Sequence, residues 1–62
     1  MSGLFPISLD DMIACAAREL EMRKKVYPRW VSQHKMSQQK ADQEIDTMRA
    51  IHDKLVAERK AQ

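Results

Sequence analysis

The chain has 62 residues, a length that allows one domain at most. Hydrophobic residues make up 44% and charged residues 32% of it, with one glycine, two prolines and one residue each of Trp, Tyr and Phe. This composition is typical of a helical rather than a β protein. The net charge of +2 is too small to indicate nucleic-acid binding by itself.

A chain this short has a marginal core, because it buries only about 60% of the surface that its unfolded form exposes. Small domains usually compensate with disulfides, a metal or oligomerisation. Cys15 is the only cysteine, and His34 and His52 are far apart with no paired thiols, so neither an intrachain disulfide nor a metal site is expected. Oligomerisation or a partner is therefore the expected source of stability.

The longest uninterrupted apolar run is Met12 to Ala17, far short of the roughly 20 residues that a membrane span needs. The first residues do not show the basic and then apolar pattern of a signal peptide. A single thiol is compatible with a reducing compartment. We therefore expect a cytoplasmic protein with no membrane contact.

A first helix is predicted over 8–33, after a short leading tail over 1–7. Ser8 and Asp11 have the spacing of a capping box, and Asp10 and Asp11 suit the positive end of the helix dipole. The apolar positions then recur in a heptad seam that Arg23 alone interrupts. The members of that seam are Leu9, Ile13, Ala16, Leu20, Tyr27 and Trp30.

Two ion pairs are expected on the outside of this helix, Glu19 with Arg23 and Glu21 with Lys25, because an acid four residues before a base is favourable. Pro28 leaves two alternatives, since it cannot donate a backbone hydrogen bond. The helix either stops there or continues with a kink to about residue 33. The seam stays in phase to Trp30, which favours the kinked continuation.

Residues 34–37 lack apolar periodicity and are predicted to form a connection. Ser37 is a suitable N-cap for a second helix over 38–60, which no glycine or proline interrupts. So short a connection makes the two helices antiparallel neighbours. The apolar positions of the second helix are Ala41, Ile45, Met48, Ile51 or His52, and Leu55.

The predicted fold is therefore all-α, an antiparallel two-helix hairpin. Further apolar residues lie off the seam and widen the apolar face: Met12, Ala17, Met22, Val26, Val31 and Val56. Packing two hairpins as a four-helix bundle would cover them, so a homodimer is expected. The residues assigned to the core or dimer seam are Leu9, Ile13, Ala16, Leu20, Ile45, Met48, Ile51 and Leu55.

The charges are segregated along the chain. Residues 22–41 hold six basic residues and no acid, whereas the rest holds five basic and nine acidic residues. A basic turn with aromatic residues suits phosphate backbones or an acidic protein surface. Its lysines are equally compatible with a solvated face, and its two rings with core or dimer packing. The candidate partner-binding residues are Arg23, Lys24, Lys25, Tyr27, Arg29, Trp30, Lys35 and Lys40.

No enzyme is predicted. The chain has no nucleophile with a suitable histidine and acid partner, no glycine-rich loop and no carboxylate cluster, so no catalytic, cofactor-binding or metal-binding residue is assigned. Cys15 is expected to be a small packed residue. If it faced outward, it would instead be placed to crosslink dimers.

The segment from Arg18 to Val31 contains the pattern Arg-Glu-Leu-x-Met-Arg-x-x-Val-Tyr-Pro and resembles short helical proteins encoded by bacteriophages and prophages. The resemblance covers roughly residues 12–55 and implies a phage context and a helical fold. It carries over no functional residues. It continues through Lys35, Met36, Ala41, Glu44, Ile45, Met48 and Ile51.

Three functions remain open. The first is a non-catalytic module that binds and modulates a host or phage protein. The second is a nucleic-acid-binding accessory protein that uses the basic turn. The third is a structural subunit whose apolar flank packs on other chains.

Overall fold

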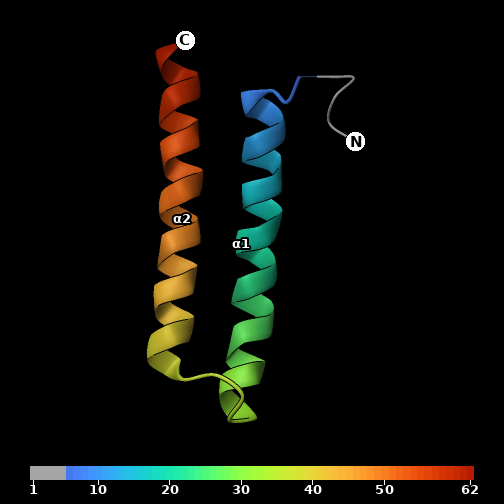
Figure 1. Ribbon diagram of the computed structural model, residues 1–62, viewed down its shortest axis with the longest axis vertical. Coiled ribbons are helices and arrows are strands. Elements are labelled where there is room, and N and C mark those ends of the chain that lie inside the picture. Colours follow the sequence, from blue (N-terminus) through green and yellow to red (C-terminus); the bar gives the residue numbers. More distant parts are fainter. Residues whose placement is uncertain (1–5) are drawn as a thin grey trace.

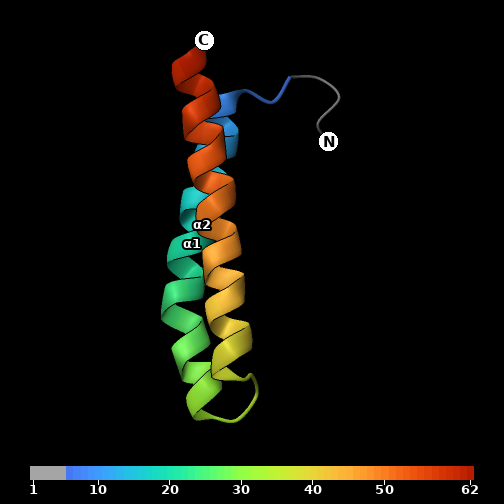
Figure 2. The same ribbon diagram turned by 90° about the vertical axis from the view of Figure 1, so that its left-hand side faces the viewer.

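The computed structural model describes residues 6–62, which form two helices, α1 (Leu9–Ser32) and α2 (Gln38–Ala61). The helices run antiparallel and side by side, with the turn at one end and the C-terminus at the other (Figures 1 and 2). The described residues contain no strand, so the predicted all-α hairpin is confirmed. The helix ends lie within one residue of the predicted ranges, while most of the predicted tail, residues 1–5, lies outside the described residues.

Both helices begin at the predicted serine caps. The Ser8 hydroxyl accepts from the Asp11 amide at 3.0 Å, and the Asp11 carboxylate accepts from the Ser8 amide at 3.4 Å. The Ser37 hydroxyl accepts from the Lys40 amide at 3.1 Å. These bonds occupy amides that have no partner within the helix, which is why each helix starts where it does.

Helix α1 continues through Pro28 to Ser32, in agreement with the predicted continuation. Pro28 is exposed and lies in the last two turns of the helix, so its missing N–H removes one bond of the ladder close to an end. Figure 1 shows α1 as one unbroken ribbon over this stretch.

The turn after α1 is a Schellman motif built on His34. Two backbone bonds close it, from the Lys35 amide to the Trp30 carbonyl at 2.9 Å and from the His34 amide to the Val31 carbonyl at 3.0 Å. His34 itself has a φ of 61°, in the left-handed region that glycine normally occupies at this position. The chain therefore reverses direction through a conformation that is costly for histidine.

The hairpin has almost no interior. Ala16 and Ala41 are the only buried hydrophobic residues among those described, and the Cα atoms extend over 41 × 28 × 13 Å, a single layer of helices. Ile51 is 45% exposed, whereas the alternative seam residue His52 is half-buried. The other assigned seam residues are half-buried, as expected for one stripe pressed between two helices: Leu9, Ile13, Leu20, Ile45, Met48 and Leu55.

Across residues 6–62, neither helix combines the length and the apolar character that a bilayer span requires.

Candidate functional site

One face of the hairpin carries nearly all of its exposed large apolar side chains. The exposed fractions are 37% for Met12, 52% for Met22, 39% for Trp30 and 45% for Ile51. We call this surface the apolar face. It comprises Met12, Cys15, Met22, Val26 and Trp30 of α1 with Ile51 and Leu55 of α2.

Two open grooves run along the apolar face and meet at Glu19. The first, of about 400 Å³, lies between the helices and is nearly free of polar lining. Its walls are Met12, Cys15, Ala16, Glu19, Met48, Ile51 and Leu55. The second, of about 230 Å³, follows α1 toward the turn and is lined by Glu19, Met22, Arg23, Val26, Tyr27 and Trp30. Both grooves are shallow and continuous, a shape that suits a helix surface rather than a small molecule.

Cys15 is exposed on this face, so the expectation that it is a packed core residue was wrong. Cys15 lies within the apolar run from Met12 to Ala17, but each residue of a helix is rotated by about 100° from the last. Buried Ala16 points at α2, and Cys15 consequently lies on the flank beside it.

Arg23 connects the two helices. Its Nε donates to Glu19 Oε1 at 2.9 Å, which confirms the predicted pair, and its Nη1 donates to the Glu44 main-chain carbonyl at 2.9 Å. Glu44 Oε1 lies 3.6 Å from the same Nη1, and the guanidinium carbon sits 5.9 Å from the centre of the Tyr27 ring. The bond to Glu19 raises the pKa of Arg23 above its ordinary value, with a smaller opposing effect of desolvation. The side chain is only 20% exposed, so Arg23 has an internal role.

The remaining cations of the basic segment fall into two groups. Lys24 pairs with Glu21 at 3.0 Å and Lys40 with Glu44 at 3.3 Å. Glu21 therefore does not form the predicted pair with Lys25. Within residues 6–62, no ion pair involves Lys25, Arg29 or Lys35, and all three are exposed. Of the eight residues predicted for the basic turn, we keep that name from here on for these three alone.

Tyr27 and Trp30 form a stacked pair, with ring centres 5.6 Å apart and planes inclined by 27°. Tyr27 is half-buried, but Trp30 is turned toward the groove on α1. The structure thus separates two features that the sequence had placed together. Trp30 belongs to the apolar face, whereas Arg29 and Lys35 line none of its grooves and Lys25 lies at its edge, beside Met22 and Val26.

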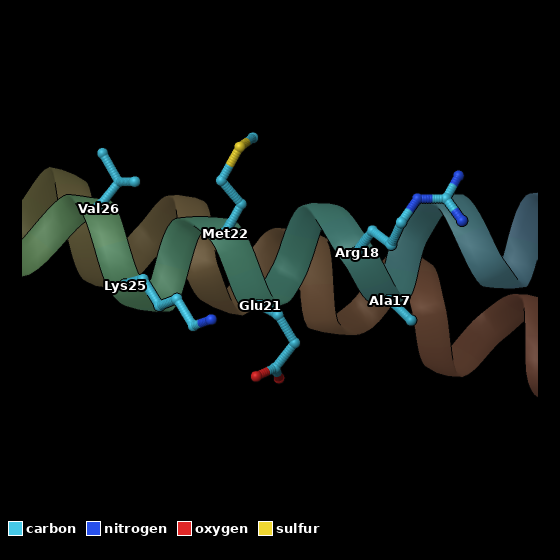
Figure 3. A pocket seen from close by; sticks show the side chains of 6 residues that line it. All are labelled: Ala17, Arg18, Glu21, Met22, Lys25 and Val26. Carbon is cyan, nitrogen blue, oxygen red and sulfur yellow. The ribbon is translucent and has the colours of Figure 1, made fainter.

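A third open groove, of about 460 Å³, lies on α1 alone. Figure 3 shows its six side chains pointing in different directions from one helix rather than toward a common centre. These are Ala17, Arg18, Glu21, Met22, Lys25 and Val26. The described residues also include no group of three His, Cys, Asp or Glu side chains that could hold a metal ion. The exposed surface of the described residues is therefore formed by open grooves rather than by side chains that converge on one point.

The composition of the apolar face was only partly accessible from the sequence. Met12, Met22 and Val26 were recognised as apolar residues off the seam, whereas Trp30 and Ile51 were assigned to the seam. The missed signal is a second heptad-like series on α1, offset by one position from the first, which runs Met12, Cys15, Glu19, Met22 and Val26. Its next position is Arg29, and Trp30 of the first seam continues the apolar surface there instead.

Comparison with known proteins found no matching family model, no matching curated protein and no matching solved structure.

Proposed function

We propose that this chain is a small, non-catalytic interaction module of the phage type, which acts as a homodimer and binds and modulates a host or phage protein. The apolar face is the observation that carries the proposal. Met22 and Trp30 on α1 and Ile51 on α2 expose apolar surface, and among residues 6–62 the only buried hydrophobic residues are two alanines. The resemblance to phage proteins supports action in the cytoplasm of a bacterial host.

The side of the hairpin that carries the apolar face has the size of a stable interface. Each helix has 24 residues, hence is about 36 Å long, and two adjacent helices are about 20 Å wide. One whole side therefore measures roughly 700 Å² per chain, or about 1,400 Å² over two copies, within the usual range for specific protein interfaces. A second hairpin would supply the second layer that a helical core requires.

The basic turn is the proposed site for the host or phage partner. Within residues 6–62, none of Lys25, Arg29 and Lys35 forms an ion pair, so their charges are available to an acidic protein surface. Arg29 and Lys35 line none of the three grooves, so both would stay accessible in the dimer, whereas Lys25 lines one groove with Met22 and Val26 and lies at the edge of the apolar face. Electrostatic complementarity of this kind steers association and selects among partners.

Two measurements test this proposal. Sedimentation equilibrium of the whole chain at micromolar concentration is expected to give twice the chain mass of 7.2 kDa. Affinity purification from a bacterial host lysate, with nuclease present, is expected to retain a protein that the triple variant Lys25→Glu, Arg29→Glu, Lys35→Glu no longer binds. The matched control is Arg18→Glu, Lys54→Glu, Lys60→Glu, which makes the same change in charge away from the turn.

A nucleic acid is the alternative ligand of the basic turn. The three cations that form no ion pair within residues 6–62 favour it, because Lys and Arg side chains that neutralise phosphates release counterions from the nucleic acid. Binding to a duplex or single strand would then weaken steeply as salt is raised, and the triple variant would flatten that dependence. Loss of all captured proteins on nuclease treatment would favour this alternative over a protein partner.

A structural subunit is the second alternative. Its apolar face would pack against different chains of a larger assembly, and the isolated protein would then sediment as a monomer. The triple variant of the basic turn would leave such assembly unchanged.

A further inference from the structure

We propose that the second copy docks on the apolar face with its turn at the opposite end, so that α1 of one copy packs antiparallel on α1 of the other. This inference deepens the proposed homodimer and depends on it. A two-fold axis through the apolar face allows only two arrangements of a hairpin pair: both turns at the same end, with α1 above α2 of the second copy, or turns at opposite ends, with α1 above α1.

The first argument is the near-symmetry of the second series on α1, taken together with Trp30. Counted from residue 21, Trp30 lies nine positions after and Met12 nine positions before. Val26 and Cys15 are five and six positions away, and Met22 and Glu19 are one and two. If α1 lies antiparallel on itself about this midpoint, each residue of one half therefore meets its counterpart in the other half.

The pairs that result are complementary in size. Trp30 is the largest side chain of the face and meets the flexible Met12 of the second copy, which adapts to an aromatic ring. The branched Val26 meets the small Cys15 of the second copy. Both pairs form twice, once on each side of the axis, and both lie on the groove walls that the single hairpin leaves open.

The centre of this arrangement is polar but already neutralised. Glu19 lies near the axis, and Arg23 of the same chain donates to it at 2.9 Å. The carboxylate therefore enters the interface with a partner, which avoids the cost of an unpaired buried charge. A single polar position within an apolar seam is also a known means of specifying the register between helices.

The second argument is charge. Residues 22–41, which include the turn, carry six positive charges and no negative one, and the remainder of the chain has a net charge of −4. Turns at opposite ends place the positive part of each copy along the negative part of the other. Turns at the same end would bring the two positive parts together, which is unfavourable at the separations of a helical bundle.

Disulfide trapping of the natural thiol tests the arrangement. In the variant Val26→Cys, the new thiol faces Cys15 of the second copy, and oxidation is expected to convert most of the protein into a covalent dimer. The wild-type chain is the first control, because the Cα atoms of its two Cys15 residues lie about 18 Å apart along the helix, beyond the roughly 7 Å limit for a disulfide. Val26→Cys combined with Cys15→Ala is the second control and is expected to remain non-covalent for the same reason.

The variant Ile51→Cys reports the competing arrangement. Ile51 lines the same groove as Cys15, so a copy with its turn at the same end would place its own Cys15 above this position. A disulfide between Cys15 and the new thiol of the same chain gives a product that migrates as a monomer under non-reducing conditions. That product is thereby distinguished from a covalent dimer. Covalent dimers from Ile51→Cys, or none from Val26→Cys in a protein that sediments as a dimer, would overturn this inference and leave the homodimer intact. A wild-type chain that sediments as a monomer would overturn both.

Discussion

The Arg23 guanidinium donates to the main-chain carbonyl of Glu44 at 2.9 Å, and this bond joins α1 to α2 across a mostly apolar seam. The Glu44 carbonyl belongs to the helical ladder and accepts Arg23 as a second donor. A further interhelical pair, Arg59 with Asp10, lies at the open end but is well exposed. Arg23 is therefore the polar contact that most restricts how the two helices align.

Replacing Arg23 by alanine is expected to lower the free energy of unfolding by about 1–3 kcal/mol, because charge-assisted bonds to partly buried acceptors contribute in that range. Urea denaturation followed by circular dichroism measures it. Lys24→Ala is the matched control, since its exposed pair with Glu21 is worth at most about 1 kcal/mol. Equal losses for the two variants would contradict the internal role of Arg23.

Arg23 is expected to contribute a stability that does not vary with pH in the neutral range. Its pKa is raised, so the stability it contributes is fully present below the ordinary arginine pKa and is lost only as pH rises through the higher value of the folded state. The difference in unfolding free energy between wild type and Arg23→Leu is therefore expected to be flat between pH 6 and 9. A slope in that interval, measured by denaturation at several pH values, would show that another titrating group governs the contact.

His34→Gly is expected to stabilise the protein by up to about 1 kcal/mol. Histidine has a φ of 61° here, and a non-glycine residue pays about 1–2 kcal/mol for this conformation, partly offset by the greater unfolded-state entropy of glycine. Thermal unfolding provides the comparison. Gln33→Gly is the neighbouring control and should give no gain, since Gln33 has a φ of −89°.

Pro28→Ala is expected to stabilise α1 by roughly 1–2 kcal/mol. Alanine restores the missing backbone donor and removes the steric conflict of the ring, while proline's lower unfolded-state entropy limits the gain. Hydrogen exchange at the amides of the last two turns of α1 should slow in this variant. Ser32→Ala is the control, because it changes a residue near the same helix end without adding or removing a backbone hydrogen bond. An equal slowing of exchange in both variants would contradict this explanation.

Met22→Glu tests the apolar face directly. A charge at this position would have to be buried in the proposed dimer, which is expected to weaken dimerisation by about 100-fold or more. The single tryptophan reports it, since Trp30 lies on the same face and its emission should shift to longer wavelength as the dimer dissociates on dilution. Ala50→Glu places the same charge on an exposed position of α2 outside the groove walls and should leave dissociation unchanged. If both variants dissociate alike, the apolar face is not the interface.

The sequence by itself determined the helices, their ends and their antiparallel order. Ser8, Ser37 and the heptad spacing are local signals, since a cap or a repeat acts on residues a few positions away. The continuation of α1 past Pro28 was also predicted, because the apolar spacing stays in register to Trp30 and a proline close to the helix end removes only one backbone hydrogen bond.

Only the tertiary structure decided which residues face outward. Cys15 and Ala16 are neighbours with small side chains, yet Cys15 is exposed and Ala16 is buried. The difference arises because α2 packs against the side of α1 that carries Ala16. The same holds for charge, where proximity to Glu44, 21 residues away in sequence, turns Arg23 from a candidate binding residue into an interhelical contact. Such pairings depend on how the two helices pack against each other, which a local sequence pattern does not predict.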